Sequence, residues 1–390
     1  MTIASQVISA PSKQAITSEP YRIMLVDDSA VIRGMLNRWL SADQECVIVG
    51  AFHNGAQAVA NVKKCNPEIV ILDIEMPEMD GLTALPLLIR QMPALKVLMA
   101  STLTRRNAEI SIRAITLGAA DYIPKPESAR SGTATADFQR ELLNKVKAIG
   151  AASRKSKDGL AAAPRHSRLS GEDEARQASN KVTKAPKEII LRKPSRVKPD
   201  ILAIGSSTGG PQALFALLGG LNKALTVPVV ITQHMPPTFT AILAEHIQNS
   251  TGLPAKEAVN GDLLRPGEVL VAPGDYHMRL VSNGAQRVIQ LNKNPPVNFC
   301  RPAVDPLFDS VAACYGPAAL GVILTGMGHD GRDGARSMVE AGGSIVAQDE
   351  KSSIVWGMPG AAAEAGLCCA VVPLSEMASL LRRYLQGAVL

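Results

Sequence analysis

The sequence has no apolar run long enough to cross a lipid bilayer. Hydrophobic residues make up 46% of its 390 residues, but glycine, proline or charged residues interrupt them well before the roughly 18 consecutive apolar residues that a membrane helix needs. The first twenty residues also lack the basic start and apolar stretch of a secretory signal. We therefore expect a cytoplasmic protein that is not inserted in a membrane, with a disordered polar tail over residues 1–20.

Cysteine motifs with CxxC spacing are absent as well. The six cysteines, at positions 46, 65, 300, 314, 368 and 369, form no CxxC motif of the kind that binds zinc. Disulfides are rare in the reducing cytosol. The cysteines are therefore predicted to be buried free thiols, and neither a zinc site nor a disulfide framework is expected.

An excess of positive charge is confined to one segment. Residues 151–199 hold 13 Lys or Arg against 5 Asp or Glu, a balance of +8, whereas the whole chain carries +6 and the remainder therefore −2. The segment has almost no large apolar residues before Ile189, which is typical of a solvated linker. A weak contact with an acidic partner or a membrane surface is the alternative. No nucleic-acid partner is expected, because the folded parts are not basic and show no helix-turn-helix pattern.

Short apolar runs alternate with helical stretches in two separate parts of the chain, and 390 residues exceed the usual size of one domain. Strand-like runs occupy 23–26, 47–49, 69–72, 97–100 and 121–123, and then 201–204, 227–232, 269–272 and 320–324. This alternation predicts an α/β fold class with doubly wound parallel sheets. We place a flavodoxin-like domain at 21–145, a basic flexible linker at 146–197 and a second α/β domain at 198–390.

Polar residues follow the ends of four predicted strands in the first domain. They are Asp27 and Asp28 after the first strand, Asp73 after the third, Ser101 after the fourth and Lys125 after the fifth. The carboxyl ends of parallel strands meet at one edge of a sheet. Three carboxylates gathered there favour a hard cation such as Mg²⁺, and one of them could attack a phosphoryl group to form an acyl phosphate. A lysine and a hydroxyl nearby would bind the phosphate oxygens.

This pattern resembles the receiver domain of two-component response regulators over nearly all of residues 21–140. The motifs that carry the resemblance are Asp27-Asp28-Ser29, Asp73 with Met76-Pro77 and Met79-Asp80-Gly81, Ser101-Thr102, and Lys125-Pro126. The resemblance implies that Asp73 accepts the phosphoryl group and that the three aspartates form the Mg²⁺ pocket. It also implies that Ser101 is the hydroxyl switch, that Tyr122 reorients with it, and that the Lys125–Pro126 bond is cis.

A serine stands on a glycine turn at the start of the second domain. The strand at 201–204 runs into Gly205-Ser206-Ser207-Thr208-Gly209-Gly210-Pro211. The GxSxG spacing matches a nucleophile elbow, the glycines permit the sharp turn, and proline is favoured at the first position of a helix. A phosphate-binding loop would need a Gly-Lys-Ser/Thr ending and a dinucleotide site GxGxxG, and both are missing. A plain glycine turn with capping serines remains the alternative.

A serine nucleophile needs a histidine base and an acid that orients it. His234 lies directly past the strand at 227–232, at the same sheet edge as Ser207, and Asp330 lies past the strand at 320–324. His329 remains a possible base on position alone. The other histidines fall in less suitable places: His53 in the first domain, His166 in the linker, His246 within a helix and His277 in a loop.

The second domain resembles the catalytic domain of the chemotaxis protein-glutamate methylesterase over about residues 198–385. The motifs are Gly-Ser-Ser-Thr-Gly-Gly at 205–210, Thr-Gln-His-Met-Pro at 232–236, Ala-Pro-Gly-Asp-Tyr-His-Met at 272–278, Arg-Pro-Ala-Val-Asp at 301–305, Gly-Met-Gly-His-Asp-Gly at 326–331, and 348–359. The resemblance implies a Rossmann-like sheet, a triad of Ser207, His234 and Asp330, and oxyanion-hole amides near Met327, with Thr208 close by. One position departs from the family pattern, because Cys300 stands where a histidine is expected.

The resemblance also implies the activity. It is a phosphorylation-activated serine hydrolase that demethylates glutamate methyl esters and deamidates glutamines on the cytoplasmic helices of chemoreceptors. A chemotaxis histidine kinase would be the phosphodonor, Mg²⁺ would serve the receiver, and the esterase site would need no cofactor. We expect the unphosphorylated receiver to cover the catalytic cleft. The alternatives are an esterase or amidase acting on another protein, and a docking module without catalysis.

Overall fold

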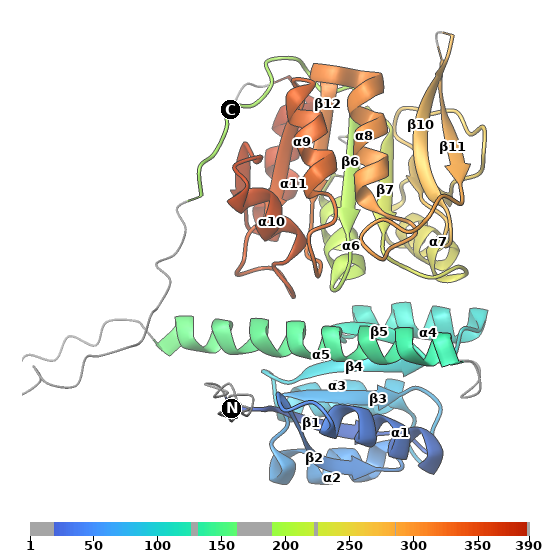
Figure 1. Cartoon of the computed structure of the whole chain (residues 1–390), viewed down its shortest axis with the longest axis vertical. Helices are drawn as coiled ribbons and strands as arrows, with labels where there is room; N and C mark the ends of the chain where they lie inside the picture. Colours follow the sequence, from blue (N-terminus) through green and yellow to red (C-terminus); the bar gives the residue numbers. More distant parts are fainter. Residues whose placement is uncertain (1–18, 126–131, 162–188, 222–224, 285, 388–390) are drawn as a thin grey trace, which may run out of the picture.

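The computed structural model describes residues 19–125, 132–161, 189–221, 225–284 and 286–387. They form two domains, each built on a parallel β-sheet flanked by helices (Figure 1). The predicted α/β class with two parallel-sheet domains is therefore confirmed. Nearly all of the predicted tail and most of the predicted linker lie outside the described residues.

The first domain contains five parallel strands in the order β2-β1-β3-β4-β5. The strands are β1 (Tyr21–Val26), β2 (Cys46–Phe52), β3 (Ile69–Asp73), β4 (Lys96–Ser101) and β5 (Asp121–Pro124), and the helices are α1 (Ala30–Ser41), α2 (Gly55–Cys65), α3 (Gly81–Gln91), α4 (Arg105–Thr116) and α5 (Gly132–Ala161). All residues of β3 are buried, as expected for a central strand covered on both faces. Because β1 and β3 are neighbours, their carboxyl ends lie side by side.

Helix α5 is longer than the sequence pattern suggested. It continues to Ala161, so the boundary that we placed at 145 falls inside a helix. The reason is that Leu142, Val146 and Ile149 are buried at helical spacing, and this apolar stripe carries the helix past the boundary. Arg154, one turn further on, pairs with Glu68 at 2.6 Å.

The second domain contains a seven-stranded sheet in the order β14-β13-β12-β6-β7-β9-β8, and every neighbouring pair is parallel. Its strands are β6 (Ile201–Ser206), β7 (Val229–Gln233), β8 (Ala255–Glu257), β9 (Val269–Val271), β12 (Ala319–Ile323), β13 (Ser344–Gln348) and β14 (Ala370–Val372). Its helices are α6 (Gly210–Leu221), α7 (Phe239–Thr251), α8 (Val304–Tyr315), η2 (Gly316–Ala318), α9 (Arg332–Glu340), α10 (Met358–Glu364) and α11 (Leu374–Leu385). The strands predicted here correspond to β6, β7, β9 and β12.

An antiparallel hairpin stands beside this sheet and was not predicted. It consists of β10 (His277–Asn283) and β11 (Gln286–Asn292). The hairpin leads into the segment 293–303, which returns the chain to α8 at the carboxyl edge of the sheet. This segment therefore brings residues from outside the sheet to the edge where the serine elbow lies.

The two domains are in contact, with α4 and α5 lying between the two sheets (Figure 1). The ring of Tyr122 stacks on that of Phe239 at the start of α7, with centroids 4.5 Å apart and planes 4° from parallel. Arg105 of α4 pairs with Glu245 of α7 at 2.8 Å. Val355 of the second domain belongs to the same buried cluster as the apolar face of α5. The interface thus combines an aromatic stack, an ion pair and apolar burial.

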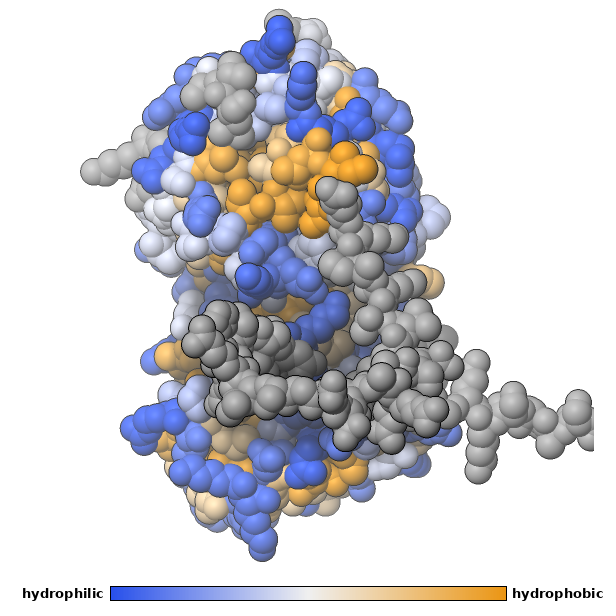
Figure 2. Space-filling model, turned by 90° about the vertical axis from the view of Figure 1, so that its left-hand side faces the viewer, coloured by the Kyte–Doolittle hydropathy of each residue, from blue (hydrophilic) through white to orange (hydrophobic). Residues whose placement is uncertain are grey.

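The surface seen in Figure 2 is mostly polar, with its most continuous hydrophobic patch on the second domain. None of the helices in the described parts of the chain is long and apolar enough to cross a membrane. All six cysteines are free thiols, and each is buried or partly buried.

Candidate active site

Ser207 occupies a sharp turn between β6 and α6. The turn is crowded, so that side chains do not fit at its glycines: a Cβ on Gly205 would lie 2.5 Å from Val304, and a Cβ on Gly210 would lie 2.0 Å from the Gln233 amide oxygen. Glycine is required where the backbone approaches its neighbours this closely. The glycines of the motif therefore hold the serine at the edge of the sheet, as a strand–turn–helix elbow does.

Two polar side chains that the sequence did not single out hold this elbow. The Gln233 amide oxygen accepts a hydrogen bond from the Ser206 hydroxyl at 2.6 Å, and its nitrogen donates to the Ser207 carbonyl at 2.9 Å. On the other side, the Thr325 hydroxyl donates to the Thr208 carbonyl at 2.9 Å. Both residues lie at or just past the end of a strand. Only their burial distinguishes them from other polar residues, and burial cannot be seen in a single sequence.

His234 and Asp330 meet as expected from their strand ends. His234 Nε2 lies 2.7 Å from Asp330 Oδ2. The histidine backbone is fixed as well, because its N–H donates to the Ser206 carbonyl at 3.1 Å. Burial lowers the pKa of His234, but Cys300 and Asp330 raise it more, so the net pKa lies above the usual 6.5.

Asp330 belongs to a buried pair of carboxyl groups. Asp330 accepts hydrogen bonds from the backbone N–H groups of Val304 at 2.6 Å and Asp305 at 3.2 Å. The Asn298 amide nitrogen donates to both carboxyl groups, at 2.8 Å to Asp305 and 3.0 Å to Asp330. Burial and the charge of Asp330 raise the pKa of Asp305 to about 6. Burial also disfavours the charge of Asp330, but the bonds from His234 and Val304 outweigh it and lower the pKa. The carboxyl group that faces His234 therefore ionises at a lower pH than its neighbour.

The other histidines of this domain lie in different surroundings. His329 is exposed and forms no side-chain hydrogen bond within the described part of the chain. His277 is buried, with Nε2 3.1 Å from the Pro295 carbonyl and Nδ1 accepting from the Ala303 N–H. His246 packs on the ring of Phe215. Of the candidate bases, His234 is thus the one that is joined to a carboxylate at the serine's edge of the sheet.

The remaining residues predicted near the serine are Thr208 and Met327. The Thr208 hydroxyl is buried and has no hydrogen-bond partner among the described residues. A buried hydroxyl without a partner is costly and suits a site that receives a polar ligand. Met327 is partly buried and packs against the apolar cluster that contains α5. The loop around Asp330 therefore adjoins the apolar cluster that the two domains share.

The hydroxyl of Ser207 makes no hydrogen bond to His234 among the described residues. The second ring nitrogen of the histidine, Nδ1, instead lies 3.4 Å from Cys300 Sγ. Within the described residues His234 is therefore hydrogen-bonded to Asp330 but not to Ser207. The thiol beside its other nitrogen belongs to Cys300, the position at which the sequence departs from the family pattern.

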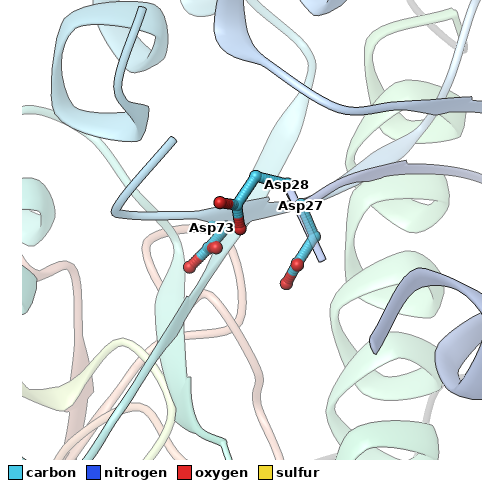
Figure 3. Close-up of side chains that lie close together, drawn as sticks. All are labelled: Asp27, Asp28 and Asp73. Carbon is cyan, nitrogen blue, oxygen red and sulfur yellow. The ribbon is translucent and has the colours of Figure 1, made fainter. Parts of the chain in front are cut away.

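The acidic pocket of the first domain is assembled at the ends of β1 and β3 (Figure 3). One carboxylate oxygen from each of Asp27, Asp28 and Asp73 lies within 4.8 Å of the others. Lys125 Nζ is 2.6 Å from Asp27 and 2.7 Å from Asp73. Burial raises the pKa of Asp73 to about 6, although Lys125 opposes this shift. Among the described residues, Lys125 is the cation that forms ion pairs with these carboxylates, and an all-oxygen donor set fits Mg²⁺.

The predicted switch residues lie between this pocket and the second domain. The buried Ser101 hydroxyl accepts a hydrogen bond from Ser111 at 3.1 Å. Tyr122 is buried under Phe239. The predicted cis bond at Lys125–Pro126 lies outside the described residues, because these end at Lys125.

The fold and the site together define a class of protein: an enzyme in which a response-regulator receiver domain is joined to a hydrolase domain with a serine elbow. The family model described as CheB methylesterase matches residues 202–381, and that described as response regulator receiver domain matches residues 23–136. The chain belongs to the family of protein-glutamate methylesterases/protein-glutamine glutaminases.

Two relatives of this name match nearly the whole chain, and a solved structure is similar to part of it. The chain is 48% identical to the protein-glutamate methylesterase/protein-glutamine glutaminase of Rhodopseudomonas palustris (strain BisB5), over 97% of each chain. It is 48% identical to the one of Azospirillum brasilense, over 96% of this chain and 95% of that protein. The crystal structure of the Thermotoga maritima CheB methylesterase catalytic domain is 39% identical, with a TM-score of 0.47, over 48% of this chain and 99% of that chain.

Proposed function

We propose that this enzyme is activated by phosphorylation and removes methyl groups from glutamate side chains, and amide nitrogen from glutamine side chains, on the cytoplasmic helices of chemoreceptors. The observation that carries the proposal is the contact of 2.7 Å between His234 and a buried Asp330 beside the serine elbow. A chemotaxis histidine kinase would supply the phosphoryl group. The enzyme would work in the cytoplasm, where the receptor helices that it demethylates set sensory adaptation.

In the proposed mechanism Ser207 is the nucleophile and His234 is the general base. Because Asp330 occupies Nε2 of the imidazole, Nδ1 is the nitrogen that receives the Ser207 proton. The serine oxygen attacks the γ-carbonyl carbon of the methylated glutamate, and the carbonyl oxygen becomes an oxyanion. The proton on Nδ1 then passes to the methoxy oxygen, and methanol leaves. Water repeats the sequence on the acyl-serine and releases the glutamate carboxylate.

The elbow and the loop of Met327 would stabilise the oxyanion. Backbone amides at the start of α6 and around Met327 are fixed before the substrate arrives, because Thr325 bonds to the elbow and glycines close the turn. Such preorganised donors contribute roughly 3–4 kcal/mol each to the transition state in serine hydrolases. The unpaired Thr208 hydroxyl is a further donor at this place. No cofactor is required for these steps.

The receiver would control access to the cleft. Asp27, Asp28 and Asp73 would hold Mg²⁺, which neutralises phosphate charge when it is bound. Phosphate on Asp73 would engage Lys125 and draw the Ser101 hydroxyl toward it. Movement near Ser101 disturbs Tyr122, and therefore the stack on Phe239 that helps to hold the domains together. Phosphate contacts that form only in the open state would shift the equilibrium toward open molecules by their free energy.

The proposal is tested by the release of methanol from methylated receptor membranes, with and without a small phosphodonor and Mg²⁺. We expect the phosphodonor to raise the rate at least about fivefold, the low end of typical allosteric coupling. The Asp73→Asn variant should keep the basal rate and lose the rise. A wild-type enzyme that releases no methanol under any condition would contradict the proposal and favour another acyl substrate or a docking role.

Loss of the aromatic stack should raise the basal activity. In Tyr122→Ala the stack on Phe239 is gone, and aromatic pairs contribute about 0.5–1.5 kcal/mol beyond their buried area. We therefore expect unphosphorylated enzyme to work up to about tenfold faster, whereas the rate with phosphodonor changes little. Tyr122→Phe keeps the ring and serves as the matched control. A basal rate in Tyr122→Ala equal to that of Tyr122→Phe would rule out inhibition through this contact.

A further inference from the structure

Each ring nitrogen of His234 has one hydrogen-bonding neighbour within the described part of the chain. Nε2 lies 2.7 Å from Asp330, and Nδ1 lies 3.4 Å from Cys300 Sγ. A contact of this length is within the usual range for a hydrogen bond that involves sulfur. Because Nε2 is committed to the carboxylate, the thiol occupies the nitrogen that Ser207 must use.

The segment that carries Cys300 is held firmly against the site. Asn298 and Phe299 both adopt positive φ, at 52° and 64°, which costs energy for residues other than glycine and persists only where neighbouring contacts enforce it. Here Asn298 bonds to both buried carboxyl groups. Backbone hydrogen bonds of 2.9 and 3.1 Å join Val297 and Cys300. Phe299, between the two inward residues, is 87% exposed. The backbone therefore directs the side chain of Asn298 toward Asp305 and Asp330, and that of Cys300 toward His234.

The charges around the imidazole make this contact consequential. The groups that face His234 are Asp330 and Cys300, with Asp305 behind Asp330. Asp330 and a thiolate at Cys300 both favour the protonated imidazole, whereas burial disfavours it. If the proton moves from sulfur to Nδ1, the base is already protonated and cannot accept the proton of Ser207.

We propose that Cys300 is a positioning residue for the catalytic base: its thiol holds Nδ1 of His234 in the resting enzyme and must release it before Ser207 can transfer its proton. Any proton that the sulfur has given to Nδ1 must first return to the sulfur. Cys300 therefore sets the pH at which the base becomes available. This inference rests on the triad of the proposed function, and one of its two tests does not depend on catalysis.

The first test is the pH dependence of kcat for methanol release by full-length enzyme with phosphodonor. In Cys300→Ala the imidazole loses a neighbour that favours its charged form, so the midpoint of the acid limb should move down by at least about one pH unit. The rate near pH 6 should then rise about tenfold, and KM should stay within about twofold. Cys300→Ser, whose hydroxyl does not ionise in this range, should shift the midpoint in the same direction. Unshifted midpoints in both variants would overturn the proposal, including the case in which kcat falls equally at every pH.

The second test measures the reactivity of the thiol itself. Iodoacetamide forms an S–C bond with cysteine as iodide leaves, and it reacts with the thiolate. We expect carbamidomethylation of Cys300 at pH 7, followed by peptide mass spectrometry, to be about tenfold slower in His234→Gln than in wild type. The rate at Cys314, another partly buried free thiol, should be the same in both proteins. Equal or faster alkylation of Cys300 in His234→Gln would overturn the proposal. The alkylation rate is measured without any esterase activity. A failure of the proposed function can therefore be distinguished from a failure of this proposal.

Discussion

Replacing Ser207 with alanine should abolish methanol release, with a fall in kcat of at least about 10⁴-fold, because loss of a triad nucleophile removes most of the catalysis in serine hydrolases. The hydroxyls of the two adjacent residues are not expected to replace it as the nucleophile. The Ser206 hydroxyl is bonded to Gln233, and the Thr208 hydroxyl is buried one residue further along the turn. The measurement is methanol release from methylated receptor membranes in the presence of phosphodonor.

Two controls make this result specific. Phosphorylation of Asp73 in the Ser207→Ala protein should proceed at the wild-type rate, which shows that the receiver domain is folded and intact. Ser206→Ala removes the adjacent hydroxyl and should lower kcat far less, because Gln233 still bonds to the Ser207 carbonyl. Activity within tenfold of wild type in Ser207→Ala would mean that a different group attacks the substrate.

Replacing Asp330 with asparagine should lower kcat by about 10⁴-fold, the effect of the equivalent change in a serine protease triad. Both carboxylate oxygens now accept from donors: Oδ2 from His234 and the Val304 N–H, and Oδ1 from the Asp305 N–H and Asn298. An asparagine NH₂ group must therefore face donors in either orientation. Turned toward His234, it would donate to Nε2 and move the ring proton to Nδ1, where the base is needed.

The same substitution should also destabilise the second domain. Two hydrogen-bond donors that face each other in a buried site leave at least one of them without an acceptor, which costs about 1–3 kcal/mol. Urea denaturation followed by circular dichroism would measure this loss in the free energy of unfolding. Asp333→Asn is the matched control, since Asp333 is an exposed aspartate of α9 that pairs with Arg332 and is expected to change stability by less than about 0.5 kcal/mol. An Asp330→Asn enzyme that retained a tenth of the wild-type kcat would exclude Asp330 as the residue that orients the base.

The sequence predicted those parts of the molecule that depend on local pattern and sheet geometry. Apolar runs located the strands, and the ends of parallel strands brought Asp27 together with Asp73, and His234 together with Asp330. The hairpin β10–β11 and the segment after it escaped this reasoning. Their residues reach the site from outside the sheet, so the spacing of Asn298 carried no signal.

The particular residues that join the domains were also beyond the sequence. The receiver resemblance singled out Tyr122, but nothing in the sequence identified Phe239, more than a hundred residues away, as the ring on which it stacks. The length of α5 was underestimated for a similar reason, since Val146 and Ile149 follow a helical pattern in a region that becomes basic only a few residues later. Composition marked the change in charge and not the end of the helix.

The interface around Tyr122 has a consequence for the order of events at the receptor. Under the proposed control, a receptor helix in the cleft and a docked receiver exclude each other, so the helix binds only to open molecules. Thermodynamic reciprocity then requires that substrate favour phosphorylation of Asp73 by the same factor by which phosphorylation favours substrate binding. Under that scheme the phosphorylated form would be more stable on an enzyme that already rests on its receptor, and the signal would be concentrated on the copies that are in place to use it.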